Sequence, residues 1–274
     1  MKNKIKDTVI SLASPLIFDA IRRFRGTKIS FVGNFRSWEE AKIASTGYSA
    51  QVILDRTVQA ARKVRDGEAA YERDSVIFAR TDYNFPLAWA LMRAAARHGG
   101  LHVLDFGGAL GSSYFQSREL INSISNLKWI IVEQSAHVEV GSREFANGVL
   151  SFHRTIEEAC NLYQIDVLLL SGVIQCLQDP FGFLDDVLSR RIPSVILDRT
   201  PFMLDGAKRL TVQHVPKRIY PATYPAWFFS EDELMHRFVK HYDKIATWPA
   251  LDRHHPEGGR AEYKGFLFEV KIPS

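Results

Sequence analysis

The chain has 274 residues, of which 46% are hydrophobic and 24% are charged, so it can bury the core of an α/β domain and large-scale disorder is excluded. Its formal net charge of +4 is a mild excess and does not indicate nucleic-acid binding. Only Cys160 and Cys176 are available, which excludes a disulfide framework and favours a reducing, cytoplasmic location.

The N-terminal segment places three lysines before an apolar stretch at 9–21. A spanning helix needs about 20 apolar residues, so this stretch is too short. Pro15 and Asp19 also interrupt it. We interpret it as an amphipathic helix packed against the body of the protein, with peripheral contact to a membrane surface as the alternative.

Residues 1–98 are expected to form a mostly helical N-terminal extension, or cap. Ser37 and Glu40 have the spacing of a capping box, which predicts a short helix ending near Gly47. A loose apolar stripe over 52–64 favours a second helix. A third is expected over 85–96, where two glycines then act as a stop signal.

From residue 99 onward short apolar runs alternate with helical stretches, which is typical of a parallel sheet with helices on both faces. A second Ser/Thr capping box at Thr155 and a third at Ser230 open two of the helices. The expected strands are 101–104, 129–132, 149–152, 167–170, 194–197, 242–248 and 266–272, with the last one reversed. The predicted fold is therefore α/β, a Rossmann-like, mostly parallel seven-stranded sheet over 99–274.

The main chemical signal follows the first of these strands, where Asp105 leads into a turn of small residues and a helix. The spacing of Asp105, Gly107, Ala109 and Gly111 is not the G-x-G-x-x-G of dinucleotide-binding sheets. It resembles the D/E-x-G-x-G-x-G motif of class I methyltransferases, with alanine in place of the middle glycine. That resemblance implies that Asp105 anchors the amino acid end of S-adenosylmethionine, while Gly107, Gly108 and Gly111 pass beneath the cofactor. A purely structural turn is the alternative.

Two other strand ends carry polar residues. Glu133 follows the second strand, and its two carboxylate oxygens suit the ribose hydroxyls of the cofactor. Capping of the following helix is the alternative role for Glu133. Ser171 ends the fourth strand at the edge where open α/β sheets bind ligands, although it also fits a plain turn. His153, after the third strand, is either an adenine contact or a surface residue.

Three stretches together resemble a family of class I methyltransferases associated with bacterial surface-polysaccharide gene clusters. They are Phe31-Val-Gly-Asn-Phe35-Arg-Ser37-Trp38-Glu-Glu-Ala41, Ser171-Gly-Val-Ile-Gln175, and the aromatic run from Tyr220 to Ser230. With the glycine-rich turn, the resemblance covers roughly residues 30–270. It implies the fold and S-adenosylmethionine as cofactor, and it supplies no established acceptor or catalytic residue.

The acceptor site is expected in an insertion over about 199–229, directly after the fifth strand. Its aromatic and basic side chains suit a sugar or an anionic molecule, and a packed aromatic lid is the alternative. A proton acceptor is needed for a hydroxyl, and the candidates are His214 by its intrinsic pKa and Asp198 by its position. The candidate substrate-binding residues are Arg199, Tyr220, Tyr224 and Trp227. No metal site is predicted.

The sequence therefore predicts S-adenosylmethionine-dependent methylation of an oxygen or nitrogen atom in a small-molecule or saccharide acceptor. No nucleic-acid partner is expected, and the oligomeric state is left open. One alternative is an NAD(P)-dependent oxidoreductase on a similar sheet, against which the glycine spacing argues. A non-catalytic scaffold that binds S-adenosylmethionine is the other, and Ala109 and the unassigned base are compatible with it.

Overall fold

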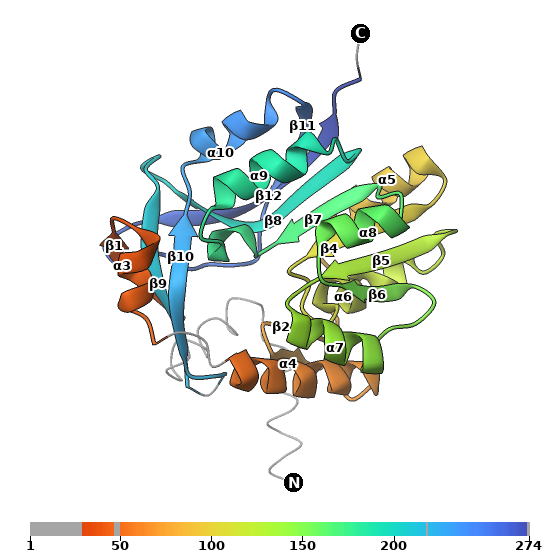
Figure 1. Ribbon diagram of the computed structural model, residues 1–274, viewed down its shortest axis with the longest axis horizontal. Helices are drawn as coiled ribbons and strands as arrows, with labels where there is room; N and C mark the ends of the chain where they lie inside the picture. Colours follow the sequence, from red (N-terminus) through yellow and green to blue (C-terminus); the bar gives the residue numbers. More distant parts are fainter. Residues whose placement is uncertain (1–28, 47–49, 218, 273–274) are drawn as a thin grey trace.

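The computed structural model describes residues 29–46, 50–217 and 219–272 (Figure 1). The expected amphipathic helix at 9–21 lies outside the described residues, as does the expected helix end at Gly47. Within the described ranges, no helix is long and apolar enough to cross a membrane.

The central feature is a seven-stranded sheet in the order β11-β12-β8-β7-β4-β5-β6. Strands β6, β5, β4, β7 and β8 run parallel, while β12 runs antiparallel to both of its neighbours. This confirms the predicted Rossmann-like sheet with its reversed last strand. The bounds are β4 (Leu101–Phe106), β5 (Leu127–Val132), β6 (Leu150–His153), β7 (Val167–Ser171), β8 (Ser194–Met203), β11 (Tyr242–Pro249) and β12 (Ala261–Val270).

Helices cover both faces of this sheet, because its central strands are apolar on both sides. One core cluster packs Val103 and Leu169 against helices α4 to α7, and the other packs Leu104 and Leu168 against α8 to α10. Figure 1 shows these two layers on either side of the strands. The bounds are α4 (Ala50–Arg65), α5 (Phe85–His98), α6 (Ser112–Ile121), α7 (Ser135–Glu144), α8 (Ile156–Leu162), η1 (Ile174–Cys176), α9 (Pro180–Ser189) and α10 (Glu231–Phe238).

Helix starts follow the predicted capping residues. The side-chain oxygen of Ser37 accepts the backbone N–H of Glu40 at 3.2 Å, at the start of α3 (Trp38–Ile43). Thr155 accepts from Glu158 at 3.0 Å in the same way. Each contact satisfies a backbone donor that has no partner within its helix. The three predicted capping boxes are thus confirmed at α3, α8 and α10.

The extension contains strands that the sequence did not predict. Strand β1 (Ser30–Phe35) pairs antiparallel with β9 (Arg209–Val215), which pairs with β10 (Ala222–Phe228). A short hairpin, β2 (Tyr71–Arg73) and β3 (Val76–Phe78), lies between α4 and α5. The expectation of a mostly helical extension therefore missed three strands. Because β1 and β9 are far apart in the chain, neither segment shows its partner in the local pattern.

Candidate functional site

The glycine-rich turn lies at the carboxyl end of β4, in the middle of the sheet. Gly107, Ala109 and Gly111 have φ values of 72°, 51° and 101°, so the turn is built largely from left-handed backbone. A Cβ on Gly107 would lie 2.4 Å from a methyl group of Val173. Glycine is therefore required there for space as well as conformation. Ala109 adopts the left-handed conformation at a cost of about 1 kcal/mol.

Asp105 lies beneath this turn and is almost inaccessible, with 1% of its surface exposed. The indole Nε1 of Trp129 donates a hydrogen bond to Asp105 Oδ2 at 3.0 Å. A Cβ on Gly108 would lie 2.6 Å from the same oxygen, so the loop backbone rests directly on the carboxylate. Burial raises the pKa of Asp105 to about 7, and the charge of Glu133 adds to this effect. Asp105 therefore supports the loop from below.

Glu133 and His153 mark the carboxyl ends of β5 and β6. Glu133 is partly exposed, and its Oε2 accepts the backbone N–H of Gln134 at 2.7 Å, just before α7. This contact is compatible with the capping role and leaves part of the carboxylate facing solvent. His153 is buried at 8% exposure, with Nε2 lying 3.2 Å from Ser151 Oγ. The surface interpretation of His153 is therefore wrong.

A second buried carboxylate, which the sequence analysis missed, lies at the start of α6. Glu72 of β2 is only 4% exposed. It accepts hydrogen bonds from the hydroxyl of Ser112 and from the backbone N–H of Ser75, the latter at 3.0 Å. Burial raises the pKa of Glu72 to about 7, the charge of Asp74 raises it further, and Arg199 opposes the shift.

Ser171, the last residue of β7, is the register partner of Asp198, which lies in the middle of the longer strand β8. The Asp198 carboxylate is 1% exposed and receives two donors. Trp248 Nε1 donates at 3.1 Å and Asn84 Nδ2 at 2.8 Å, one to each oxygen. Burial raises the pKa of Asp198. Asp198 therefore lies at the predicted edge of the sheet, held by side chains from α5's start and from β11.

Arg199 follows Asp198 with a left-handed φ of 54° and is held by two carboxylates. Its Nε lies 2.9 Å from Asp252 Oδ2, and its Nη2 lies 2.7 Å from Asp74 Oδ2. Asp252 is mostly buried, with a side-chain exposure of 13%, whereas that of Asp74 is 54%. Burial works against ionisation of Asp252, but the Arg199 charge outweighs it and lowers the pKa of this carboxyl.

Tyr220 and Tyr224 lie near this ion-paired group. Tyr220 is 8% exposed, and its hydroxyl is hydrogen-bonded to Tyr224. Burial raises the pKa of Tyr220 to about 12, and the neighbouring charges of Asp74 and Glu72 add to the rise. Cys176 belongs to the same neighbourhood, and burial raises the pKa of its thiol to about 12. The structure therefore brings Arg199, Tyr220 and Tyr224 together.

His214 and Trp227 do not share that location. Neighbouring positions of a strand point to opposite faces, and His214 pairs with Thr223 while Gln213 pairs with Tyr224. His214 is exposed on the face of the second sheet against which α3 packs. Tyr224 lies on the opposite face. Trp227 stacks on Trp38 of α3 at 6.4 Å and donates from its indole to Leu177 O at 3.1 Å. Core packing is thus the observed role of both tryptophans.

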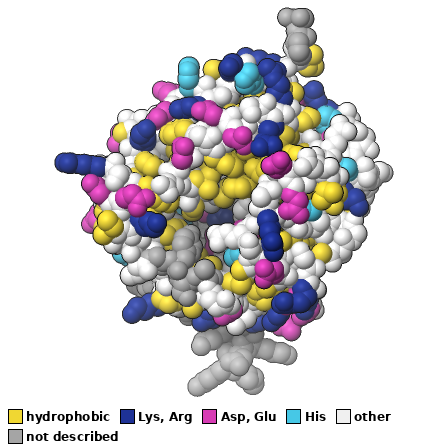
Figure 2. Space-filling view, in the orientation of Figure 1, with side chains coloured by type: hydrophobic (Ala, Val, Ile, Leu, Met, Phe, Trp, Pro, Cys, Tyr) yellow, Lys and Arg dark blue, Asp and Glu magenta, His cyan; other side chains and the backbone are white. Residues whose placement is uncertain are grey.

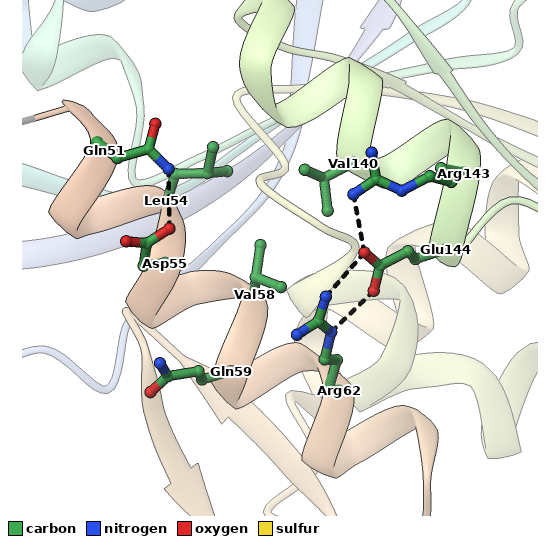
Figure 3. Close-up of a pocket in the computed structure, with 9 residues that line it drawn as sticks. All are labelled: Gln51, Leu54, Asp55, Val58, Gln59, Arg62, Val140, Arg143 and Glu144. Atoms are coloured by element: carbon green, nitrogen blue, oxygen red, sulfur yellow. Dashed lines mark hydrogen bonds and ion pairs between the residues drawn. The ribbon is translucent and has the colours of Figure 1, made fainter.

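The molecule is hollowed near the centre of the face seen in Figure 2. A separate shallow pocket lies between α4 and α7 (Figure 3). There Glu144 is ion-paired with Arg62 at 2.8 Å and with Arg143 at 3.0 Å, and Asp55 accepts a hydrogen bond from the amide of Gln51. In the described part of the chain, His, Cys, Asp and Glu nowhere form a group of three able to hold a metal.

No protein-family model matches the sequence, and no curated protein is significantly similar to it. Among solved structures, the chain is similar to the N-terminal domain of EvdMO1, which was determined in the presence of SAH and D-fucose. The two sequences are 14% identical, the TM-score is 0.45, and the match covers 82% of this chain and 98% of that one. It is also similar to magnesium protoporphyrin IX methyltransferase (ChlM) from Synechocystis PCC 6803 with bound SAM, with 14% identity, a TM-score of 0.44 and coverage of 80% and 97%.

A third similar structure is described as a pericyclic reaction enzyme, with 11% identity and a TM-score of 0.47; the match covers 70% of this chain and 49% of that one. The strand order and the reversed β12 of the present chain define a Rossmann-like sheet of the class I methyltransferase type.

Proposed function

We propose that this protein transfers a methyl group from S-adenosylmethionine to an oxygen or nitrogen atom of a small acceptor. The observation that carries this is the loop after β4, where Gly108 rests on the buried Asp105 carboxylate. The loop presents a surface of backbone and small residues at the carboxyl edge of the sheet, where such folds bind ligands. Bound there, the cofactor supplies a methyl group already activated by the sulfonium.

The residues around the loop fit the cofactor. Gly107 and Gly108 let the loop pack closely on Val173 and on Asp105, which fixes the loop from beneath, and Gly111 leads from the loop into α6. Glu133, on the neighbouring strand β5, is partly exposed and offers a carboxylate to the ribose hydroxyls. Ser171 lies on the other side of β4, at the end of β7, and is assigned to the methyl-bearing side of the cofactor.

The acceptor that best suits the site is a neutral, hydroxyl-rich molecule such as a saccharide. Arg199 is already paired with Asp74 and Asp252, so it offers little free positive charge to an anion. Tyr220 and Tyr224, each 8% exposed, place two neutral phenol groups beside it. A neutral acceptor therefore replaces the anionic one as our preferred substrate class. A role in surface-polysaccharide biosynthesis is part of this proposal.

Asp198 is the preferred proton acceptor. It lies in the middle of β8, level with Ser171 at the carboxyl end of β7, and burial raises its pKa, which makes its carboxylate a stronger base. The acceptor hydroxyl would take the place of Asn84 as donor to Asp198 Oδ2. His214 is disfavoured because its side chain lies on the opposite face of the second sheet from Tyr224. Most of the rate enhancement would come from alignment of methyl donor and acceptor. The two free cysteines, Cys160 and Cys176, suit the cytoplasmic location that we propose.

The test is incubation with S-adenosylmethionine and a panel of neutral saccharides, acidic saccharides and amines, with product detection by mass spectrometry. We expect a methylated neutral saccharide whose formation is strongly reduced by Asp198→Asn. Protection against thermal unfolding by NAD(P) and not by S-adenosylmethionine would favour the oxidoreductase. Cofactor binding without product across the panel would favour the non-catalytic scaffold.

A further inference from the structure

Beyond the expected cofactor residues, the hairpin β2–β3 brings a carboxylate to the cofactor loop. Glu72 reaches Ser112, the first residue of α6, and Ser112 directly follows Gly111 at the end of the loop. The hairpin also contacts α6 through Arg73, whose Nη2 lies 3.4 Å from Gln116 Oε1. The hairpin therefore forms one wall at the point where the loop becomes a helix.

The position of Glu72 along the sheet identifies the part of the cofactor that it would meet. Glu133, the proposed ribose partner, lies on β5, on one side of β4. Arg199 lies on β8, two strands away on the other side, at a distance of about 10 Å from β4 by ordinary strand spacing. The turn between β2 and β3 carries Asp74, which is ion-paired with Arg199 at 2.7 Å, whereas Asp105 is hydrogen-bonded to Trp129 of β5. Glu72 therefore lies toward the end of the cofactor that is remote from the ribose.

The amino acid end of S-adenosylmethionine carries a cationic ammonium group and requires an acidic partner. Asp105, to which the family resemblance assigns this role, is turned toward β5 by Trp129 and covered by Gly108. Glu72 accepts two hydrogen bonds, and an ionised carboxylate has about four acceptor positions, so capacity for an ammonium group remains. Gly111, the N-cap residue before α6, has no side chain to cap the helix, so the first N–H groups of α6 suit the cofactor's carboxylate.

On the basis of the proposed function, we infer that Glu72 binds the ammonium group of the cofactor's amino acid end. The hairpin β2–β3 is then part of the cofactor site, and its acidic residue selects ligands that carry the amino acid group. Asp105 supports the loop, and Glu133 holds the ribose.

The inference is tested by calorimetric titration with two ligands that differ in this group. S-adenosylhomocysteine carries the amino acid group, whereas 5′-methylthioadenosine keeps the adenosine and thioether and lacks it. We expect Glu72→Gln to weaken binding of S-adenosylhomocysteine about tenfold or more, as for loss of a charged hydrogen bond, and to leave methylthioadenosine affinity unchanged. Glu133→Gln should weaken both ligands by the same factor, and the exposed Glu68→Gln should affect neither.

Retained binding of methylthioadenosine shows that Glu72→Gln is folded. Glutamine keeps the size of the side chain, an oxygen for the N–H of Ser75, and an amide N–H that can donate to the Ser112 hydroxyl. An equal loss for both ligands, or no loss for either, would overturn the role of Glu72 and leave the proposed function standing. Wild-type protein that binds neither ligand would overturn the proposed function and this inference with it.

Discussion

The indole of Trp129 and the carboxylate of Asp105 are joined by a hydrogen bond of 3.0 Å between β5 and β4, and neither residue exposes more than 1% of its surface. This contact fixes the carboxylate directly beneath Gly108, so that the loop rests on it. A buried acceptor of this kind is costly without its donor. The geometry of the loop therefore depends on a residue that would not itself touch a ligand.

Trp129→Phe removes the donor and leaves the Asp105 carboxyl buried without it. We expect the free energy of unfolding to fall by about 2–4 kcal/mol, from the lost hydrogen bond and the smaller side chain together. Denaturant unfolding measures this change. Trp89→Phe on α5 is the control, because Trp89 is 46% exposed and its replacement should change stability little. Equal effects of the two substitutions would contradict the importance of the contact.

Gly108→Ala and Ala109→Gly, at two neighbouring positions of the loop, should change the stability of the protein in opposite directions. Gly108→Ala places a methyl group against the Asp105 carboxylate, so we expect loss of stability and of cofactor binding. Ala109→Gly relieves a left-handed φ of 51° and should stabilise the protein by about 0.5–1 kcal/mol. Thermal unfolding and calorimetry on both variants test the pair. Stabilisation by Gly108→Ala would contradict the observed packing.

Stability should decrease as pH rises from about 4 to about 7. In the unfolded chain the carboxyls of Asp105 and Glu72 have pKa values near 4, while in the folded protein both are raised to about 7. In this window the folded state holds protons that the unfolded state has released, so their stabilising effect is complete below pH 4 and is lost by pH 7. The slope is about 1.4 kcal/mol per pH unit for each group at most.

Groups facing these carboxyls are Glu133 for Asp105, and Asp74, Arg73 and Arg199 for Glu72. Unfolding curves at several pH values measure the slope, and Asp105→Asn combined with Glu72→Gln should flatten it. A double variant with the wild-type slope would assign the pH dependence to other groups.

The two carboxylates that hold Arg199 should contribute unequally to the free energy of unfolding. Asp252→Asn removes the mostly buried partner and is expected to cost about 3 kcal/mol, because it leaves the Arg199 charge under-compensated. Asp74→Asn removes a partner with an exposed side chain and should cost less than about 1 kcal/mol. Denaturant unfolding of both variants at neutral pH compares them. The reverse order would show that the hairpin contact is the stronger one.

The second sheet separates two residues that the sequence placed in one acceptor site. Tyr224→Phe removes a hydroxyl bonded to Tyr220, and we expect kcat/KM for the acceptor to fall about tenfold. His214→Ala, on the opposite face, should leave kcat/KM within about twofold. Steady-state kinetics with the acceptor found in the panel compare the two. A larger effect of His214→Ala would restore His214 as the base.

The seven-stranded sheet could be predicted because its signals are local. Val167–Leu170 is an apolar run that only a doubly covered strand explains, and Thr155 with Glu158 marks a helix start within four residues. Asp105, Glu133 and Ser171 end strands that run parallel, so their meeting at one edge of the sheet follows from the fold class.

Other features depend on contacts between distant parts of the chain. The pairing of β10 with β9 places His214 and Tyr224 on opposite faces of the second sheet. The packing of those faces depends on β1 and α3, which lie far from β9 in the chain. The sequence around Glu72 likewise gives no sign of its surroundings, because Ser112 and Arg199 lie near it in space and far from it in the chain. Local periodicity carries no information about such pairings, and so the hairpin and the ion pairs of Arg199 were not predicted.

The central claim, that the loop after β4 binds S-adenosylmethionine, is tested most directly by calorimetric titration of the wild-type protein. S-adenosylmethionine, S-adenosylhomocysteine and NAD are the ligands, with Gly108→Ala and Glu133→Ala as variants. We expect saturable binding of the first two ligands, none of NAD, and weaker binding in both variants. Folded wild-type protein that binds neither adenosyl ligand, or that binds NAD instead, would contradict the account.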